Sequence, residues 1–154
     1  MGIVTTKTGD KGTTYLKDKI VSKGSLRVEA MGTIDELIAN LILTQAVTGL
    51  DQELFEKPVK TLVEIGSYLS FYKGEPDFKN ITEHMETVIQ ARREAFNGFI
   101  YPYGNLRNAQ LNVLRTVVRR TERALIRLHE ESALPEALLI FMNRLSDYIY
   151  VLIA

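Results

Sequence analysis

Apolar residues recur three and four positions apart along most of the chain, which is the spacing that gathers them on one face of an α-helix. Clusters of glycine, proline and polar residues interrupt this pattern at intervals. The pattern predicts five helices, at residues 26–48, 52–72, 82–96, 106–131 and from Pro135 almost to the C-terminus. Five amphipathic helices with short connections are typical of an up-and-down bundle, so we expect an all-α fold.

Two of these helices carry a clear apolar stripe. The first predicted helix is expected to bury Met31, Ile34, Ile38, Leu41 and Ile42. The fourth is expected to bury Leu111, Leu114, Val118, Leu125 and Leu128. In the second helix, Pro58 either kinks the helix or opens a new segment at its first turn.

A polar arm of about 24 residues precedes the first helix and contains the stretch "TKTGDKGTTYL". Its glycines allow backbone amides to converge, while its lysines and hydroxyls suit the oxygens of a phosphate. The stretch lacks the spacing and the strand-to-helix junction of a Walker loop. From composition alone, it is either an anion-binding loop or a flexible tail. We expect a single domain over residues 1–154, with the arm at 1–24 and the bundle at 25–154.

The amino-acid composition argues against several classes of function. The 154 residues contain 19 lysines and arginines against 19 aspartates and glutamates, so no overall field attracts nucleic acid or an anionic membrane. The chain has no cysteine, which excludes thiolate catalysis, and only two histidines, which disfavours a histidine-rich metal site. No apolar run approaches the roughly 20 residues that span a bilayer. We therefore expect a soluble cytoplasmic protein whose anion site is local.

Polar residues on three of the predicted helices require an explanation. On the fourth helix they form one stripe, which is either a solvated surface or a site: Asn108, Asn112, Arg115, Arg119 and Glu122. In the fifth helix, polar residues interrupt an apolar segment and act as structural bridges or as part of a site: Asn143, Arg144, Ser146 and Asp147. On the first helix, Asp35 and Glu36 are ordinary first-turn carboxylates if Thr33 is an N-cap.

Four segments, taken together and in this order, resemble the ATP:corrinoid adenosyltransferases of the propanediol-utilisation type. They are "TKTGDKGTTYL", "VEAMGTIDEL", "LRTVVRRTERAL" and "MNRLSDYIYVL", and they cover nearly the whole chain. The resemblance implies a ferritin-like five-helix bundle that forms a homotrimer with sites between subunits. It also implies the reaction, in which reduced cobalamin attacks the 5′ carbon of ATP and expels triphosphate. Magnesium would arrive with ATP rather than on protein side chains, and a cobalamin reductase would be a partner.

The same resemblance assigns residues. The loop that closes over the nucleotide phosphates corresponds to Thr6, Lys7, Thr8, Gly9, Asp10 and Gly12. Lys23 corresponds to a further nucleotide-binding lysine, Arg119 to an arginine that contacts the triphosphate, and Asn143 to an asparagine that holds the nucleotide. Glu122 and Arg123 fall in the same motif and are assigned to the site, Glu122 with a catalytic role beside Arg119.

Five further positions follow from the resemblance. Arg115 and Asp35 match a salt bridge across the subunit boundary. Phe99 matches an aromatic residue that helps displace the lower axial ligand of the corrinoid, although a loop anchor is its alternative role. On the corrinoid side, the chain carries Tyr103 and Asn112 where relatives commonly have a glycine and a histidine.

Two other functions stay open at this point. The chain could be a degenerate relative that binds ATP in a trimer and acts as a sensor or partner-binding module. A purely structural bundle is the third alternative, but it leaves the composition of the arm unexplained. If the arm belongs to the site, we expect Thr6 to Thr14 to act as a lid that orders only when ATP binds.

Overall fold

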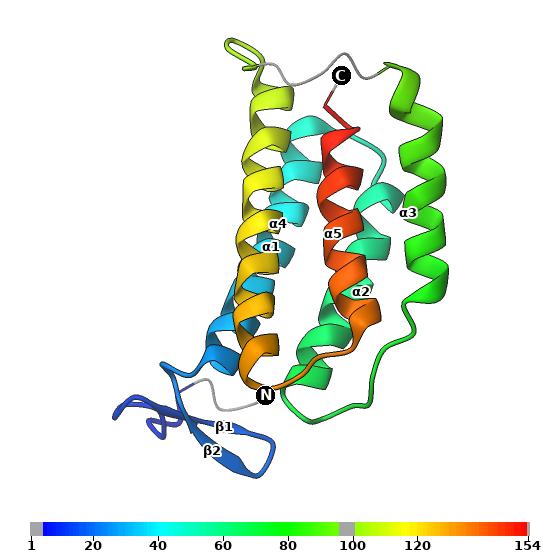
Figure 1. Cartoon of the computed structure of the whole chain (residues 1–154). Helices are drawn as coiled ribbons and strands as arrows, with labels where there is room; N and C mark the ends of the chain where they lie inside the picture. The colour runs from blue at the N-terminus through cyan, green and yellow to red at the C-terminus, as the bar shows by residue number, and fades with distance from the viewer. Residues whose placement is uncertain (1–4, 96–100, 154) are drawn as a thin grey trace.

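The computed structural model describes residues 5–95 and 101–153, and five α-helices account for most of them (Figure 1). They are α1 (Leu26–Thr48), α2 (Glu53–Leu69), α3 (Lys79–Arg92), α4 (Leu106–Glu131) and α5 (Glu136–Tyr150). A single 3₁₀ turn, η1 (Arg93–Ala95), continues α3. The helices run alternately up and down, so the predicted all-α bundle is confirmed.

Each helix contributes apolar side chains to one central core. Helix α1 packs against α2 and α4, and α5 packs against α3 and α4. The core includes fully buried side chains from every helix, such as Leu41, Leu62, Met85, Leu114 and Phe141. Burial of this apolar surface is the main stabilising term of the fold.

The start of α1 differs from one reading of the sequence. Ser25 is the N-cap, and its hydroxyl accepts a hydrogen bond from the Val28 N–H at 3.2 Å. Thr33 is therefore not an N-cap but lies inside the helix, where its buried hydroxyl donates to the Ala30 carbonyl at 2.8 Å. Asp35, two residues further on, lies well beyond the first turn, so the first-turn explanation of this carboxylate is wrong.

The stripe expected on α1 is also wrong at one position. Ile34 and Leu41 are buried and Met31 and Ile38 are half-buried, but the Ile42 side chain is 58% exposed. Helix α1 makes its main helix contacts with α2 and α4, and neither of them covers the Ile42 side chain. All five residues of the predicted α4 stripe are buried, as expected.

The C-terminal ends of α1 and α2 are built differently. Gly49 follows α1 with φ 66°, and its N–H donates to the Gln45 carbonyl at 2.9 Å, which is a usual glycine stop. After α2, Phe71 has φ 69°, its N–H donates to the Tyr68 carbonyl, and the next N–H donates to Ser67. This is a Schellman motif with phenylalanine in the left-handed position, where a side chain costs about 1 kcal/mol relative to glycine.

Helix α2 contains Pro58 without interruption, beginning and ending slightly inside the predicted bounds. A proline has no N–H, so in a regular helix the carbonyl of Leu54, four residues earlier, loses its donor. The hydroxyl of Tyr148 on α5 donates to this carbonyl at 2.7 Å. A side chain from a second helix thus satisfies the acceptor that the proline leaves open.

The arm contains a small antiparallel sheet that the sequence analysis did not predict. Strands β1 (Thr13–Leu16) and β2 (Lys19–Ser22) pair so that Leu16 lies opposite Lys19, and Lys17 in the turn has φ 59°. Leu16 is only 3% exposed, so the hairpin is anchored to the bundle. In Figure 1 the hairpin lies at the base of the bundle, near the start of α1 and the end of α4.

Candidate functional site

The polar loop before the hairpin folds back on the end of β2. The Lys23 N–H donates to the Gly12 carbonyl at 2.8 Å, and the Gly12 N–H donates to the Gly9 carbonyl at 3.2 Å. The hydroxyls of Thr6 and Thr8 lie 2.9 Å apart. Gly12 has φ 85°, a conformation that glycine adopts without strain. The structure therefore describes this segment as a turn rather than an extended tail.

Lys23 packs directly on this loop. A Cβ atom added to Gly9 would lie 2.8 Å from the Lys23 Nζ and 3.2 Å from the Thr13 carbonyl oxygen, so a larger residue would have to displace the ammonium group. The loop thus combines a cation, hydroxyls and backbone amides in one exposed place. This combination suits an anion such as a phosphate. Among the predicted phosphate-binding residues, Lys23 thus contacts both Gly12, through its N–H, and Gly9, through its side chain.

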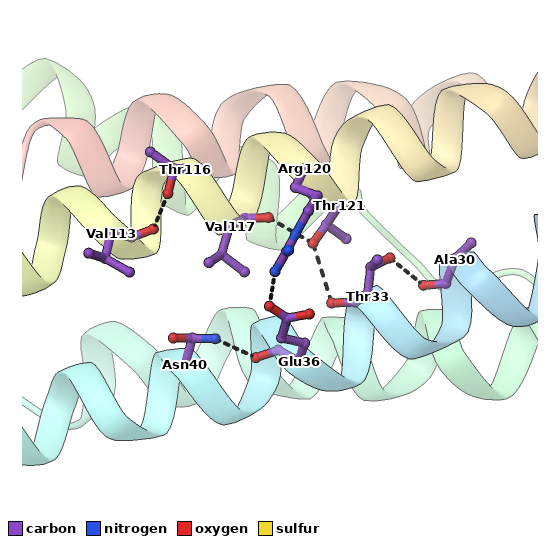
Figure 2. A network of polar contacts seen from close by, with 9 residues as sticks. All are labelled: Ala30, Thr33, Glu36, Asn40, Val113, Thr116, Val117, Arg120 and Thr121. Carbon is purple, nitrogen blue, oxygen red and sulfur yellow. Dashed lines mark hydrogen bonds and ion pairs between the residues drawn. The ribbon is translucent and has the colours of Figure 1, made fainter.

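Helix α4 is held against α1 by polar contacts in the middle of both helices (Figure 2). Arg120 forms an ion pair with Glu36, and the buried Thr121 hydroxyl donates to the Val117 carbonyl at 2.9 Å and approaches the Thr33 carbonyl at 3.3 Å. Arg120 and Thr121 both face α1, and at about 100° per residue Arg119 lies roughly 150° from the middle of that face, on the far side of α4. The contacts to α1 therefore fix where Arg119 emerges.

The polar stripe of α4 follows the edge that faces α5. Arg115 donates from Nε to the Asn112 Oδ1 at 3.1 Å, and its guanidinium lies 6.0 Å from the centre of the Tyr150 ring on α5. The two helices run in opposite directions. Glu122 lies two turns after Arg115 on α4, and Asn143 lies two turns before Tyr150 on α5, so Glu122 and Asn143 are at the same level of the bundle. The two ends of the predicted site on α4 and α5 thus share one edge of the bundle.

Glu122 has an unusual environment. Its Oε2 atom is buried and has no hydrogen-bond partner among the residues that the structure describes. Buried carboxylate oxygens are normally paired, because a missing hydrogen bond costs free energy. The oxygen can accept a donor from a ligand or a second chain. On the same helix, Arg119 and Arg123 are exposed and lie within three residues of Glu122. On α5, Asn143 is exposed as well.

The structure does not bring Asp35 and Arg115 to one face of the chain. Asp35 lines a groove of about 500 Å³ between α1, α2 and β1. Arg115 lies instead where α4 faces α5, beside Tyr150. Likewise, the Thr6–Gly12 loop lies at the base of the bundle, whereas Arg119 and Asn143 lie within the lengths of α4 and α5. The predicted site residues thus form two separate groups within the chain.

Some predicted features lie outside this geometry. Phe99 falls in residues 96–100, outside the described part of the chain. Tyr103 is 94% exposed, and Asn112 is already used as the acceptor for Arg115.

Within residues 5–95 and 101–153, no group of three or more histidine, aspartate or glutamate side chains could hold a metal ion. In the same ranges, none of the helices combines the length and apolar character needed to cross a membrane.

A family model for cobalamin adenosyltransferases matches residues 4–154. The chain is 36% identical to a corrinoid adenosyltransferase of Bacillus subtilis over 160 aligned positions, which cover 94% of this chain and 81% of the relative. It is 35% identical to a corrinoid adenosyltransferase of Citrobacter freundii, covering 94% of this chain and 89% of that protein.

Solved structures of adenosyltransferases have a similar fold. A variant PduO-type adenosyltransferase from Lactobacillus reuteri, in complex with ATP, superposes with a TM-score of 0.89 at 29% identity, covering 97% of this chain and 91% of that one. Another variant from Lactobacillus reuteri, in complex with cobalamin and ATP, gives a TM-score of 0.88 at 30% identity, again covering 97% and 91%.

Proposed function

The chain belongs to the cobalamin adenosyltransferase family, and from this premise we propose that it transfers the 5′-deoxyadenosyl group of ATP to the cobalt of a reduced corrinoid. The observation that carries the proposal is the folded Thr6–Gly12 loop with Lys23 packed on Gly9, in a chain that matches the family from residue 4 to residue 154. The products are adenosylcobalamin and triphosphate. The degenerate ATP-binding sensor is the alternative that the assay below distinguishes.

The chemistry needs no nucleophile from the protein. Cobalt in the +1 state supplies the electron pair for the new cobalt–carbon bond, and the C5′–oxygen bond breaks as triphosphate leaves with its electron pair. This fits a chain without cysteine. The protein's task is to position ATP and to neutralise the negative charge of the leaving group with Lys7, Lys23 and Arg119. Asn143 and Arg123 hold the nucleotide, and the free oxygen of Glu122 accepts a hydrogen bond from it.

Magnesium would accompany the triphosphate and neutralise part of its charge. The residues of the arm fit such an ion, since the exposed oxygens of Thr6, Thr8 and Asp10 can accept hydrogen bonds from the water molecules bound to it. Reduced corrinoid requires an electron donor, so a cobalamin reductase stays a predicted partner. The role of Phe99 in displacing the lower axial ligand and the cytoplasmic location also stay predictions.

The active site forms between subunits of a homotrimer in this proposal. Two observations support it: the phosphate loop and the Arg119–Asn143 edge are separate within one subunit, and Asp35 and Arg115 lie on different faces. A neighbouring subunit that presents its α4–α5 edge to the groove would bring Arg115 to Asp35. The same contact would carry Arg119 and Asn143 towards the loop, so nucleotide binding would require assembly.

A direct assay tests the reaction. We expect the protein, mixed with ATP, magnesium and chemically reduced cobalamin, to form adenosylcobalamin, followed by the absorbance of the cobalt–carbon product. Arg119→Ala should raise the KM for ATP about tenfold or more, because a charge-assisted hydrogen bond to phosphate is lost. Arg127→Ala removes another exposed arginine of α4 and serves as the control. Measurable ATP binding without product would refute the transferase and favour the sensor.

The arm is tested separately by hydrogen exchange. We expect amide protection in Thr6 to Thr14 to rise when ATP and magnesium are added, because phosphate contacts order the loop. Exchange in the middle of α4 should stay unchanged and provides the internal control. Equal exchange of the loop with and without ATP would contradict its proposed function as a nucleotide-binding lid.

A further inference from the structure

Phe71 occupies a backbone position that favours glycine. It follows α2 in the left-handed conformation, with φ 69°, in the same place where Gly49 follows α1 with φ 66°. A simple helix stop would be served better by glycine, because a side chain is strained there. An observed backbone outlier of this kind points to a role for the side chain itself.

The phenylalanine ring contacts two cations from two different parts of the chain. The Lys19 Nζ lies 4.2 Å from the ring centre, and the Arg27 guanidinium lies 4.6 Å from it. Both distances are within the range of cation–π attraction. Lys19 is the first residue of β2, whereas Arg27 belongs to the first turn of α1. The ring therefore joins the hairpin to the base of the bundle.

Arg27 is itself firmly held. It donates to the Leu69 carbonyl at the end of α2 at 3.1 Å and to the Ser132 hydroxyl just beyond α4 at 3.3 Å. The Phe71 ring and Arg27 thus form a fixed surface contributed by the ends of three helices. Lys19, which is exposed, is the partner that moves with the hairpin.

The hairpin is directly connected to the phosphate loop. Strand β1 begins at Thr13, immediately after Gly12, and β2 ends one residue before Lys23. The Lys23 N–H closes the loop onto the Gly12 carbonyl at 2.8 Å. Any contact that fixes the hairpin against the bundle therefore also fixes where the loop and the Lys23 ammonium lie.

We propose that Phe71 is a positioning residue for ATP, which docks the hairpin through Lys19 and thereby holds the two ends of the Thr6–Gly12 loop beside the bundle, where the loop orders when the nucleotide arrives. This inference rests on the proposed function of the loop. The apparent affinity for a ligand is the intrinsic affinity multiplied by the fraction of protein in the binding-competent state. A hairpin that is docked for a smaller fraction of the time therefore raises the KM for ATP. The ring touches no reacting atom in this scheme, and kcat stays unchanged.

The variants separate the ring from the backbone. Phe71→Gly removes the ring and at the same time suits the left-handed backbone, so the helix stop is kept. Phe71→Tyr keeps an aromatic ring and is the matched control. Lys19→Gln removes the cation from the hairpin, and Lys17→Gln removes the charge of an exposed lysine two residues away in the same hairpin. Each variant is compared with the parent in the same oligomeric state.

Two measurements are made on each variant: hydrogen exchange of residues 13–22 without nucleotide, and the KM and kcat of adenosyl transfer. We expect Phe71→Gly and Lys19→Gln to speed exchange in the hairpin and to raise the KM for ATP about two- to fivefold, the factor that one exposed cation–π contact provides. The kcat should remain within experimental error. Phe71→Tyr and Lys17→Gln should behave like the parent.

The outcomes are distinguishable from those of the proposed function. Unchanged hairpin exchange in Phe71→Gly would overturn the docking role, whether or not the parent is active. Faster exchange with an unchanged KM would overturn the positioning role while leaving the transferase intact. If the parent forms no adenosylcobalamin, the proposed function fails, and an unchanged dissociation constant for ATP alone in Phe71→Gly would then overturn the positioning role as well.

Discussion

Replacing Tyr148 with phenylalanine tests how the bundle tolerates a proline inside α2. The Tyr148 side chain is fully buried, and its hydroxyl donates to the Leu54 carbonyl at 2.7 Å. In a regular helix this carbonyl would accept from residue 58, but Pro58 has no N–H. Tyr148→Phe therefore leaves a partly buried carbonyl without its donor.

The expected loss follows from this arrangement. A buried acceptor without a hydrogen bond lowers the free energy of unfolding by about 1–3 kcal/mol. A small part of this loss is offset, because the polar hydroxyl of Tyr148 no longer has to be buried. We expect Tyr148→Phe to lower the free energy of unfolding by about 1–2 kcal/mol. For a chain of 154 residues this corresponds to a fall in Tm of about 3–6 °C.

A double-mutant cycle isolates the cause. Pro58→Ala restores an N–H that can donate to the Leu54 carbonyl, so Tyr148→Phe should cost clearly less in that background than in the parent. Urea unfolding followed by circular dichroism, at one protein concentration, gives the four free energies. An equal cost of Tyr148→Phe in both backgrounds would refute the idea that the tyrosine replaces the donor missing at the proline.

The pH dependence provides a second readout of the same residue. Burial raises the pKa of Tyr148 to about 12, from an ordinary value near 10. Its contribution to stability is complete below pH 10 and is lost as the pH rises towards 12, because the unfolded state releases its proton first. The free energy of unfolding should therefore fall more steeply between pH 10 and 12 in the parent than in Tyr148→Phe.

Three further substitutions follow from the site. Thr121→Val should lower the free energy of unfolding by about 1 kcal/mol in urea titrations, because the hydroxyl near the Thr33 carbonyl is lost from a buried position; no change would show that this contact is dispensable. Gly9→Ala should raise the KM for ATP severalfold, since the new Cβ would displace the Lys23 ammonium, and an unchanged KM would contradict the role of this contact. Arg115→Ala should shift the protein towards smaller species in sedimentation velocity, whereas unaltered sedimentation and kinetics would rule out an intersubunit bridge.

The helical part of the fold was predictable because its signals are local. The bounds of α1 and α4 agree with the predicted ranges, since Ser25 and Asn105 cap their N-termini with side-chain oxygens and Gly49 ends α1. The exposed Ile42 was misassigned because an apolar repeat does not distinguish a face that packs in the core from one that stays exposed. Periodicity thus located the helices but not all of their faces.

The arm was less predictable for a physical reason. Its two-residue turn uses Lys17 in the left-handed conformation, whereas the recognisable hairpin turns carry glycine or asparagine there. The β-branched and aromatic residues around the turn were the only available signal for the strands. The packing of Lys23 on Gly9 depends on this hairpin, so spacing alone could not reveal it. The buried oxygen of Glu122 depends on a side-chain rotamer and has no signal in the sequence.

The pairing of α1 with α4 also has a consequence for how the chain is made. The contact between Thr121 and Thr33 joins residues 88 positions apart, with α2 and α3 in between. At a synthesis rate of about 5–20 residues per second, α1 waits roughly 4 to 18 s for its partner to leave the ribosome. During that interval α2 is the only one of its two helix partners that has been made, and the apolar face of α1 that later meets α4 stays open. The first helix of the bundle therefore completes its packing only after α4 has been made.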